Sequence, residues 1–151
     1  MLNRTYDDQI CSAARTLEIV GERWTLLIVR DAMLGIRRFE DFQRSLGVAR
    51  NVLTDRLGRL VEEGVLERVA YSERPPRHEY RLTDKGRDLW PVVHALVTWG
   101  DNYAAPDGPP RKFEHRDCGG AIDDRRRCLK CGAEVTVRDV RSYRTADAAV
   151  A

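Results

Sequence analysis

Four residues toward the end of the chain have the types and the spacing of a metal site. His115 and Cys118 are three positions apart, as are Cys128 and Cys131, and a glycine follows the second residue of each pair. Thiolate and imidazole groups bind Zn²⁺ tetrahedrally, and two such pairs supply a complete set of four ligands. Glycine allows a tight turn that brings backbone amides close to the sulfur atoms. The pattern predicts one structural zinc ion per chain, with no open position for catalysis.

Two alternatives to this site stay open. Cys128 and Cys131 could instead form a redox pair in a metal-free tail, and His94 or a water molecule could replace His115 as the fourth ligand. The surrounding sequence lacks the strand and helix pattern of a thioredoxin-like domain, which argues against the redox pair. The segment has little apolar content, so we expect that it needs the metal in order to fold.

A second group of polar side chains lies at the start of a predicted helix in the middle of the chain. Between residues 49 and 64, leucine and valine recur at steps of three and four, which forms one buried helix face. Arg50, Asn51 and Thr54 lie off that face. In the DNA major groove, arginine can pair with guanine and asparagine with adenine through two hydrogen bonds each. An ordinary amphipathic surface helix would have the same pattern, so the flanking segments must decide.

The flanking segments have the order of a winged helix-turn-helix in a mainly α (α+β) fold. The periodicity predicts helices over 12–20, 24–34, 38–45 and 49–63, strands over 65–71 and 78–82, a loop over 72–77, and a long helix from Thr83 to about Tyr103. Gly21 should end the first helix in the left-handed conformation, and Pro91 should bend the last one, with Trp90 and Trp99 on its flanks. The helices over 38–45 and 49–63 form the helix-turn-helix, and the two strands with their loop form the wing.

The predicted domain organisation has four parts. A winged helix-turn-helix domain for DNA binding and dimerisation covers 1–104, a proline-rich linker 105–111, a zinc-ribbon-like extension 112–140, and a flexible tail 141–151. With 151 residues, the chain can bury one core and a small appendage of this kind.

Basic residues gather around the predicted helix-turn-helix. Between positions 37 and 59 there are six arginines and three acids, an excess that the net charge of +2 conceals. We predict contacts with base edges for Arg50, Asn51 and Thr54, and contacts with phosphates or the minor groove for Arg37, Arg38, Arg74 and Arg77. Arg56 and Arg59 could bind DNA or could pair with neighbouring carboxylates.

These segments resemble the HxlR family of bacterial transcriptional regulators, which are relatives of the MarR type. The matching runs are CSAARTLEIVGERWTLLIVRD from Cys11, RRFEDF from Arg37, NVLTDRLGRLVEEGVLER from Asn51 and PPRHEYRLTDKG from Pro75, within roughly the first 100 residues. The resemblance implies a homodimer, not an enzyme, that binds double-stranded operator DNA and dimerises through the N-terminal helix and the helix after the wing. Ser12 departs from the proline that is common in the family, and Ala49 replaces a better helix-capping serine.

The resemblance also makes Cys11 a possible redox sensor, because some HxlR-like regulators respond to oxidants through a cysteine at this position. A helix N-terminus would favour its thiolate form. The alternative is a small residue that packs in the dimer interface. An oxidant or a small molecule is therefore the expected effector.

The function predicted from the sequence is that of a DNA-binding regulator, a repressor. The alternatives are a thiol-reactive protein centred on the C-terminal CxxC, and a zinc-dependent interaction module without DNA binding. No apolar run is long enough for a membrane span, and the N-terminus lacks the apolar run of a signal peptide, which predicts a cytoplasmic protein without a membrane partner. In that reducing compartment the four cysteines point to metal or redox chemistry rather than to disulfides.

Overall fold

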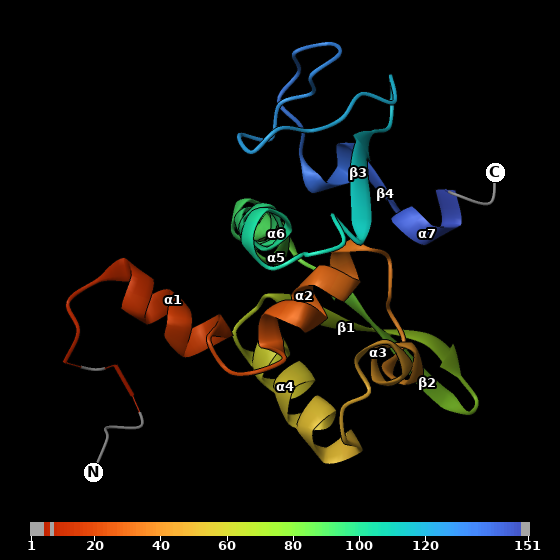
Figure 1. Cartoon of the computed structure of the whole chain (residues 1–151). Helices are drawn as coiled ribbons and strands as arrows, with labels where there is room; N and C mark the ends of the chain where they lie inside the picture. The colour runs from red at the N-terminus through yellow and green to blue at the C-terminus, as the bar shows by residue number, and fades with distance from the viewer. Residues whose placement is uncertain (1–4, 7, 149–151) are drawn as a thin grey trace. The chain divides into compact units, whose positions relative to one another are not determined.

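The computed structural model describes residues 5–6 and 8–148 (Figure 1). The chain forms two compact units, the first ending at Arg87 and the second beginning at Asp88. This division differs from the predicted one, which placed the boundary at the linker over 105–111. The difference arises because the helix after the wing belongs with the C-terminal segment. None of the helices in the described part of the chain is both long and apolar enough to cross a membrane.

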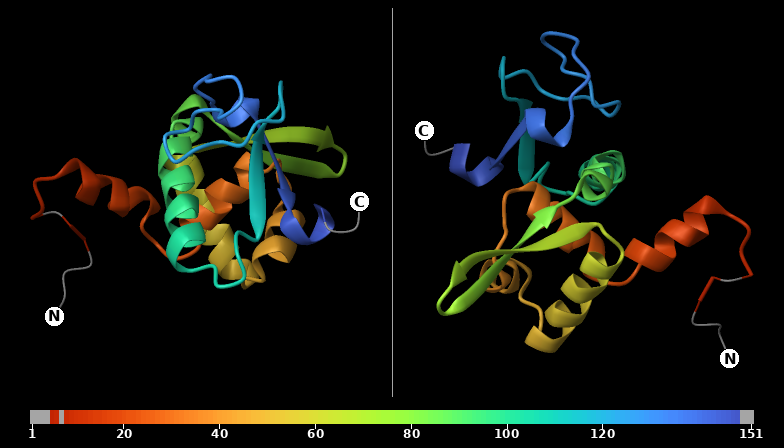
Figure 2. Two further views of the ribbon diagram at one scale, coloured as in Figure 1. Left: turned by 45° about the horizontal axis from the view of Figure 1, so that its top comes forward. Right: turned by 180° about the vertical axis from the view of Figure 1, so that it is seen from behind.

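The first unit is a winged helix-turn-helix, as predicted. Its elements are α1 (Ser12–Val20), α2 (Thr25–Met33), α3 (Phe39–Leu46), α4 (Arg50–Glu62), β1 (Leu66–Glu73), β2 (Pro76–Leu82) and α5 (Asp84–Arg87). Figure 2 shows α2, α3 and α4 gathered beside the β1–β2 hairpin. Phe42 from α3 and Leu53, Leu57 and Leu60 from α4 are completely buried. The three- and four-residue spacing of the leucines thus turns one face of α4 into the core and leaves the opposite face to solvent.

Gly21 ends α1 for a reason other than the predicted left-handed conformation. Its φ is −78°, in the ordinary helical region. A Cβ atom at this position would lie 2.3 Å from the backbone oxygen of Leu17. A glycine is therefore needed here for space, and the prediction about its backbone conformation was wrong.

The wing is a longer and tighter hairpin than predicted. β1 and β2 pair antiparallel from Leu66↔Leu82 to Glu73↔Pro76, so only Arg74 and Pro75 form the turn. The loop predicted over 72–77 was wrong because a two-stranded sheet tolerates a proline at its end, where the missing N–H need not join the ladder. The hydroxyl of Ser72 donates to the backbone oxygen of Pro75 at 3.0 Å and closes the turn.

The single bent helix predicted after the wing is two helices. α5 ends at Arg87. The next helix, α6 (Trp90–Tyr103), begins three residues later and has Pro91 in its first turn. Proline fits the first turn because the N–H that it lacks would have no helical partner there. The prediction that Thr83 caps the first of these helices was right, since its hydroxyl accepts the N–H of Gly86 at 3.1 Å.

The second unit combines α6 with a small ribbon. The ribbon contains β3 (Arg111–His115), a 3-10 turn η1 (Val137–Asp139), β4 (Val140–Arg144) and α7 (Thr145–Ala148). β3 and β4 pair antiparallel over five residues, from Arg111↔Arg144 to His115↔Val140. The flexible tail predicted over 141–151 was therefore wrong for 141–148, and 149–151 lie outside the described residues.

Side chains from the first turns of α6 fix the helix to the ribbon. Trp90, which the sequence placed on a flank, is buried, and its Nε1 donates to the backbone oxygen of Val135 at 3.3 Å. Its ring centre lies 6.2 Å from that of Phe113 in β3. His94 is also buried, and its Nε2 lies 2.8 Å from the backbone oxygen of Asp123. A carbonyl can only accept, so Nε2 carries the proton and donates it.

Candidate DNA-binding surface and candidate metal site

The start of α4 presents the three side chains predicted to contact bases. Arg50, Asn51 and Thr54 are all exposed, whereas Leu53, Leu57 and Leu60 of the same helix are completely buried. Ala49 occupies the N-cap position and makes no side-chain cap, as its methyl side chain requires. The hydroxyl of Thr54 donates to the backbone oxygen of Arg50 at 2.8 Å, so its methyl group and its remaining acceptor capacity stay free.

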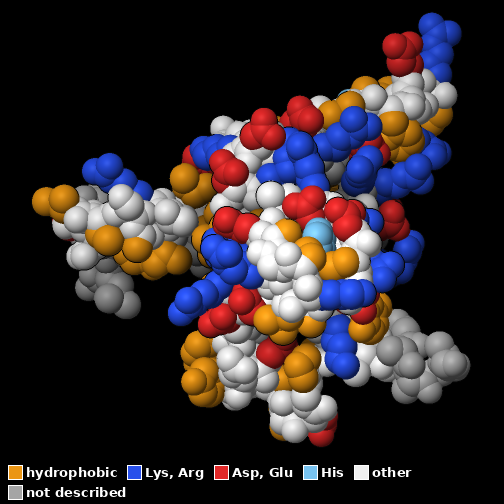
Figure 3. All heavy atoms as spheres, turned by 90° about the horizontal axis from the view of Figure 1, so that it is seen from above, with side chains coloured by type: hydrophobic (Ala, Val, Ile, Leu, Met, Phe, Trp, Pro, Cys, Tyr) orange, Lys and Arg blue, Asp and Glu red, His pale blue; other side chains and the backbone are white. Residues whose placement is uncertain are grey.

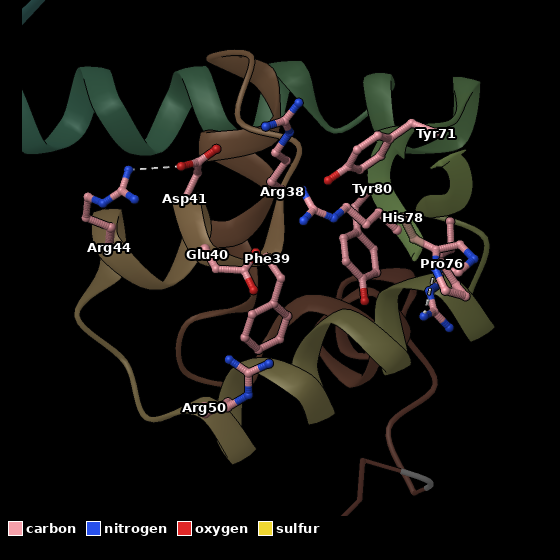
Figure 4. Close-up of a pocket in the computed structure, with 12 residues that line it drawn as sticks. Arg38, Phe39, Glu40, Asp41, Arg44, Arg50, Tyr71, Pro76, His78 and Tyr80 are labelled. Carbon is pink, nitrogen blue, oxygen red and sulfur yellow. Dashed lines mark hydrogen bonds and ion pairs between the residues drawn. The ribbon is translucent and has the colours of Figure 1, made fainter. Parts of the chain in front are cut away.

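A groove between α3, the first residue of α4 and the wing brings three of the predicted arginines together. Its volume is about 670 Å³, and Arg38, Arg50 and Arg77 line it (Figure 4). Residues that sequence reasoning did not assign to the site complete the walls; they are Phe39, Glu40, Asp41, Arg44, Arg68, Tyr71, Pro76, His78 and Tyr80. The two-residue alternation of His78 and Tyr80, opposite Arg68, was the signal that could have placed the wing side chains on this face.

Two of the arginines in this groove rest on aromatic rings. The guanidinium carbon of Arg50 lies 4.6 Å from the ring centre of Phe39, and that of Arg38 lies 4.9 Å from the ring centre of Tyr71. Stacking of this kind holds a guanidinium through its face, which leaves its N–H groups at the edge free to donate. The aromatic rings therefore orient both guanidinium groups without an ion pair to a carboxylate.

The groove is positively charged. Five arginines line it against two acids, Glu40 and Asp41. Asp41 is already paired with Arg44 at 2.9 Å. Elsewhere the charges are mixed: in Figure 3, Lys and Arg side chains lie among Asp and Glu over the visible face. The concentration of arginine in the groove thus exceeds what the net charge of the chain suggests.

The remaining predicted DNA contacts lie outside the groove. The backbone oxygen of Arg37 accepts the N–H of Tyr80 at 2.7 Å, which ties the segment before α3 to the wing. The side chain of Arg37 is not among those that line the groove, and Arg74 occupies the tip of the wing. Arg56 pairs with Glu22 and Asp55, and Arg59 pairs with Glu63 at 2.9 Å. Arg56 and Arg59 therefore form the carboxylate pairs that the sequence offered as the alternative to DNA contacts.

In the second unit, the four predicted metal ligands come together. The ligand atoms of His115, Cys118, Cys128 and Cys131 all lie within 4.8 Å of one another. The Sγ of Cys118 is 3.3 Å from that of Cys128, and the Nδ1 of His115 is 3.4 Å from the Sγ of Cys118 and 3.3 Å from that of Cys131. In a tetrahedral zinc site with Zn–S bonds of about 2.3 Å, sulfur atoms lie about 3.8 Å apart. The cluster can therefore close around one ion.

Matching backbone turns hold the two ligand pairs. The N–H of Gly119 donates to the oxygen of His115, and that of Gly132 to the oxygen of Cys128, each at 2.8 Å. Gly120 is needed for space rather than for a turn, because a Cβ there would lie 2.4 Å from the Sγ of Cys128. The glycines thus allow both the turns and the close approach of backbone to sulfur.

Backbone amides favour the thiolate form of the buried cysteine. The N–H of Cys131 and, less strongly, that of Lys130 lower the pKa of Cys128 to about 6. The pKa of Cys118 is raised. The N–H of Gly120 lowers this pKa, but the hydrogen bonds of the Cys118 thiol with Cys128 and Cys131, together with the burial of the thiol, outweigh that effect. A zinc ion binds thiolate rather than thiol, so a thiolate at neutral pH suits Cys128 as a ligand.

The other predicted chemical groups lie apart from this cluster. His94, the alternative fourth ligand, is bonded to the backbone of Asp123 instead. Cys11 is exposed at the N-cap of α1, in the first unit.

Comparison with known proteins agrees with the geometry of the first unit. The HxlR-like helix-turn-helix family matches residues 19–108. The chain is 52% identical over 130 residues to the HTH-type transcriptional regulator Rv3095 of Mycobacterium tuberculosis (strain ATCC 25618 / H37Rv), covering 85% of this chain and 82% of the relative. An alignment of 130 residues cannot end at residue 108, where the family match ends, so the similarity to this relative continues into the ribbon.

Solved structures give the same result. The crystal structure of PA1607, a proposed transcription factor, is similar with a TM-score of 0.71 and 42% identity, covering 87% of this chain and 93% of that one. The redox regulator HypR in its oxidized form is similar with a TM-score of 0.56 and 32% identity, covering 61% of this chain and 96% of that one. The chain therefore belongs to the HxlR-like helix-turn-helix family of transcriptional regulators.

Proposed function

We propose that the protein represses transcription by binding an operator in double-stranded DNA as a homodimer. The groove between α3, the start of α4 and the wing carries this proposal. It combines five arginines with an exposed helix start, and arginine is the side chain best suited to guanine edges and to phosphates. Arg50, Asn51 and Thr54 would contact base edges, while Arg37, Arg38, Arg74 and Arg77 would contact phosphates or the minor groove.

Exposed apolar side chains on two helices support the homodimer. Leu17 in α1 is 46% exposed, and Leu96, Trp99 and Tyr103 in α6 are 53%, 63% and 75% exposed. The rings of Trp99 and Tyr103 contact each other, with centres 5.3 Å apart, and leave their outer faces to solvent. Large apolar side chains exposed in this way mark association sites. A second copy of the chain would cover them and would set the spacing of the two α4 helices on the operator.

A gel-shift titration on the DNA upstream of the protein's own gene tests the proposal. The full chain would be titrated against this DNA in the presence of excess random competitor DNA, and its molar mass in solution would be measured in parallel. We expect selective binding by a dimer. Binding no tighter than to the competitor would reject operator binding at this site and would favour the zinc-dependent interaction module. Selective binding by a monomer would reject the dimer alone.

A structural zinc ion in the second unit is the other part of the proposal. When bound, the ion would cross-link the turn after β3 to the turn at Cys128. The closed set of one imidazole and three thiolates, of which Cys128 and His115 are buried, supports this role. Metal analysis should give one zinc per chain, and a Cys128→Ser variant should lose it. Metal-free protein in which Cys128 and Cys131 oxidise reversibly to a disulfide would instead support the redox pair.

Cys11 is the proposed point of regulation by oxidants. Its exposure at the N-cap of α1 makes it accessible in the protomer, and the similar protein HypR is named a redox regulator. The same gel-shift titration, run with and without a thiol oxidant on the native chain and on Cys11→Ser, tests this role. Binding that the oxidant abolishes only in the native chain would support it. Binding that the oxidant leaves unchanged would point to a small-molecule effector instead.

A further inference from the structure

A loop of the ribbon presents three consecutive arginines, Arg125, Arg126 and Arg127, that the proposed roles of the protein do not use. No carboxylate in the described part of the chain forms an ion pair with any of them, and Arg125 and Arg127 are exposed. Two other cations of the ribbon are engaged: Arg141 pairs with Glu114, and Lys130 donates to the backbone oxygen of Cys118. Exposed guanidinium groups without an acidic partner attract anions.

The backbone of this loop is held at both of its ends. Oδ1 of Asp123 accepts the N–H groups of Arg125 and Arg127, at 2.9 and 2.8 Å. The backbone oxygen of Asp123 is bonded to the buried His94 of α6. On the other side, Arg127 directly precedes Cys128 of the metal cluster. The arginines therefore project from a backbone that loses little conformational entropy when they bind a ligand.

We infer that this arginine loop binds the phosphate backbone of double-stranded DNA that flanks the operator. The inference rests on the proposed operator binding of the first unit. Guanidinium groups match phosphate oxygens through paired N–H donors, and contacts to phosphate carry no base specificity. The segment 124–127 has one acid, Asp124, against three arginines, and Glu134 is the backbone β-bridge partner of Arg127, so the loop keeps a positive excess. Such contacts would add affinity for DNA without adding to its sequence preference.

The experiment compares two double variants of the full, metal-loaded chain. Arg125→Gln with Arg127→Gln removes the exposed charges of the loop, and Lys112→Gln with Arg144→Gln removes the same charge from the β3–β4 strands. Each is titrated at several salt concentrations on a long duplex with the operator and its flanks, and on a short duplex with the operator alone. Zinc content and circular dichroism verify that each variant is folded.

Two lost phosphate contacts should lower the slope of log K against log salt by about 2 per protomer on the long duplex. The loss of affinity between 50 and 200 mM salt would then be smaller by about 10-fold per protomer. On the short duplex the loop variant should have the same salt slope as the native chain. The strand variant should have the native salt slope on both duplexes.

Three results would overturn the inference. The loop variant could keep the native salt slope on the long duplex, as expected if the loop contacts an acidic protein instead. Both double variants could lower the slope equally, which would be an effect of net charge. Finally, the native chain could fail to select the operator, which would reject the proposed function together with the inference, whereas the first two results leave that function intact.

Discussion

The guanidinium carbon of Arg50 lies 4.6 Å from the ring centre of Phe39, so the first residue of α4 rests on the first residue of α3. These two helices form the helix-turn-helix, and this contact spans the turn between them at the surface. Arg50 thus approaches any ligand with its side chain already ordered, and Phe39 has a function that its position in the sequence did not reveal.

Replacing Arg50 by alanine should reduce the preference for the operator over random DNA by about 1–3 kcal/mol, the range of a paired contact to a base. Binding titrations on both DNAs would measure the change. Arg59→Ala is the matched control on the same helix, because Arg59 is paired with Glu63. An equal loss of affinity for operator and random DNA would show that Arg50 contacts only phosphate.

The ring of Phe39 should contribute to DNA affinity through Arg50. We expect Phe39→Leu to weaken operator binding in the native chain and to have little effect in an Arg50→Ala background. The coupling free energy should be about 0.5–1 kcal/mol, the strength of an exposed cation–π contact. A double-mutant cycle measured by gel shift gives this value. Additive effects of the two substitutions would contradict the proposed link.

Arg74 at the tip of the wing should act on all DNA sequences alike. We expect Arg74→Ala to weaken binding to operator and random DNA by the same factor, and to lower the salt slope by about 1 per protomer. Salt titrations on the two DNAs provide the measurement. A larger loss on the operator would instead make Arg74 a reader of the minor groove.

Gly120 should be required for metal binding. In Gly120→Ala the new Cβ would meet the Sγ of Cys128 at 2.4 Å and the Cβ of Lys130 at 2.7 Å. An overlap of this size typically costs about 1–3 kcal/mol, so zinc affinity should fall by about 5-fold to 150-fold. Competition with a zinc indicator would measure it. Gly100→Ala in α6 is the control, since no atom lies within 4 Å of a Cβ there. Native zinc affinity in the Gly120 variant would disprove the close approach.

Local patterns predicted most of the first unit. The bounds of α1 agree to the residue, and those of α2, α3 and α4 agree within one residue at each end. The buried face of α4 was also predicted, because the spacing of Leu53, Leu57 and Leu60 depends only on the pitch of a helix. In the candidate metal site, ligand spacing along the chain was enough to select residues that the fold brings together.

What the sequence did not reveal depends on long-range contacts. β4 has a charged, unremarkable sequence and forms a strand only because β3, over twenty residues earlier, pairs with it. Trp90 is buried by Val135 and Phe113, which no periodicity within α6 could indicate. The groove depends on the register of the wing opposite α3, so Arg68 and Tyr80 were missed although both stand in a predicted strand.

The packing of Trp90 and His94 against the ribbon has a consequence for any shortened form of this protein. The sequence suggests a cut in the proline-rich segment over 105–111, and a cut just after residue 108 would keep the whole region that matches the family. Such a cut would remove Val135 and Phe113 from the indole and the backbone of Asp123 from the imidazole. The truncated chain would present an apolar, uncovered α6 and should self-associate non-specifically. The ribbon is thus part of the packing of α6 in this chain and not a detachable accessory.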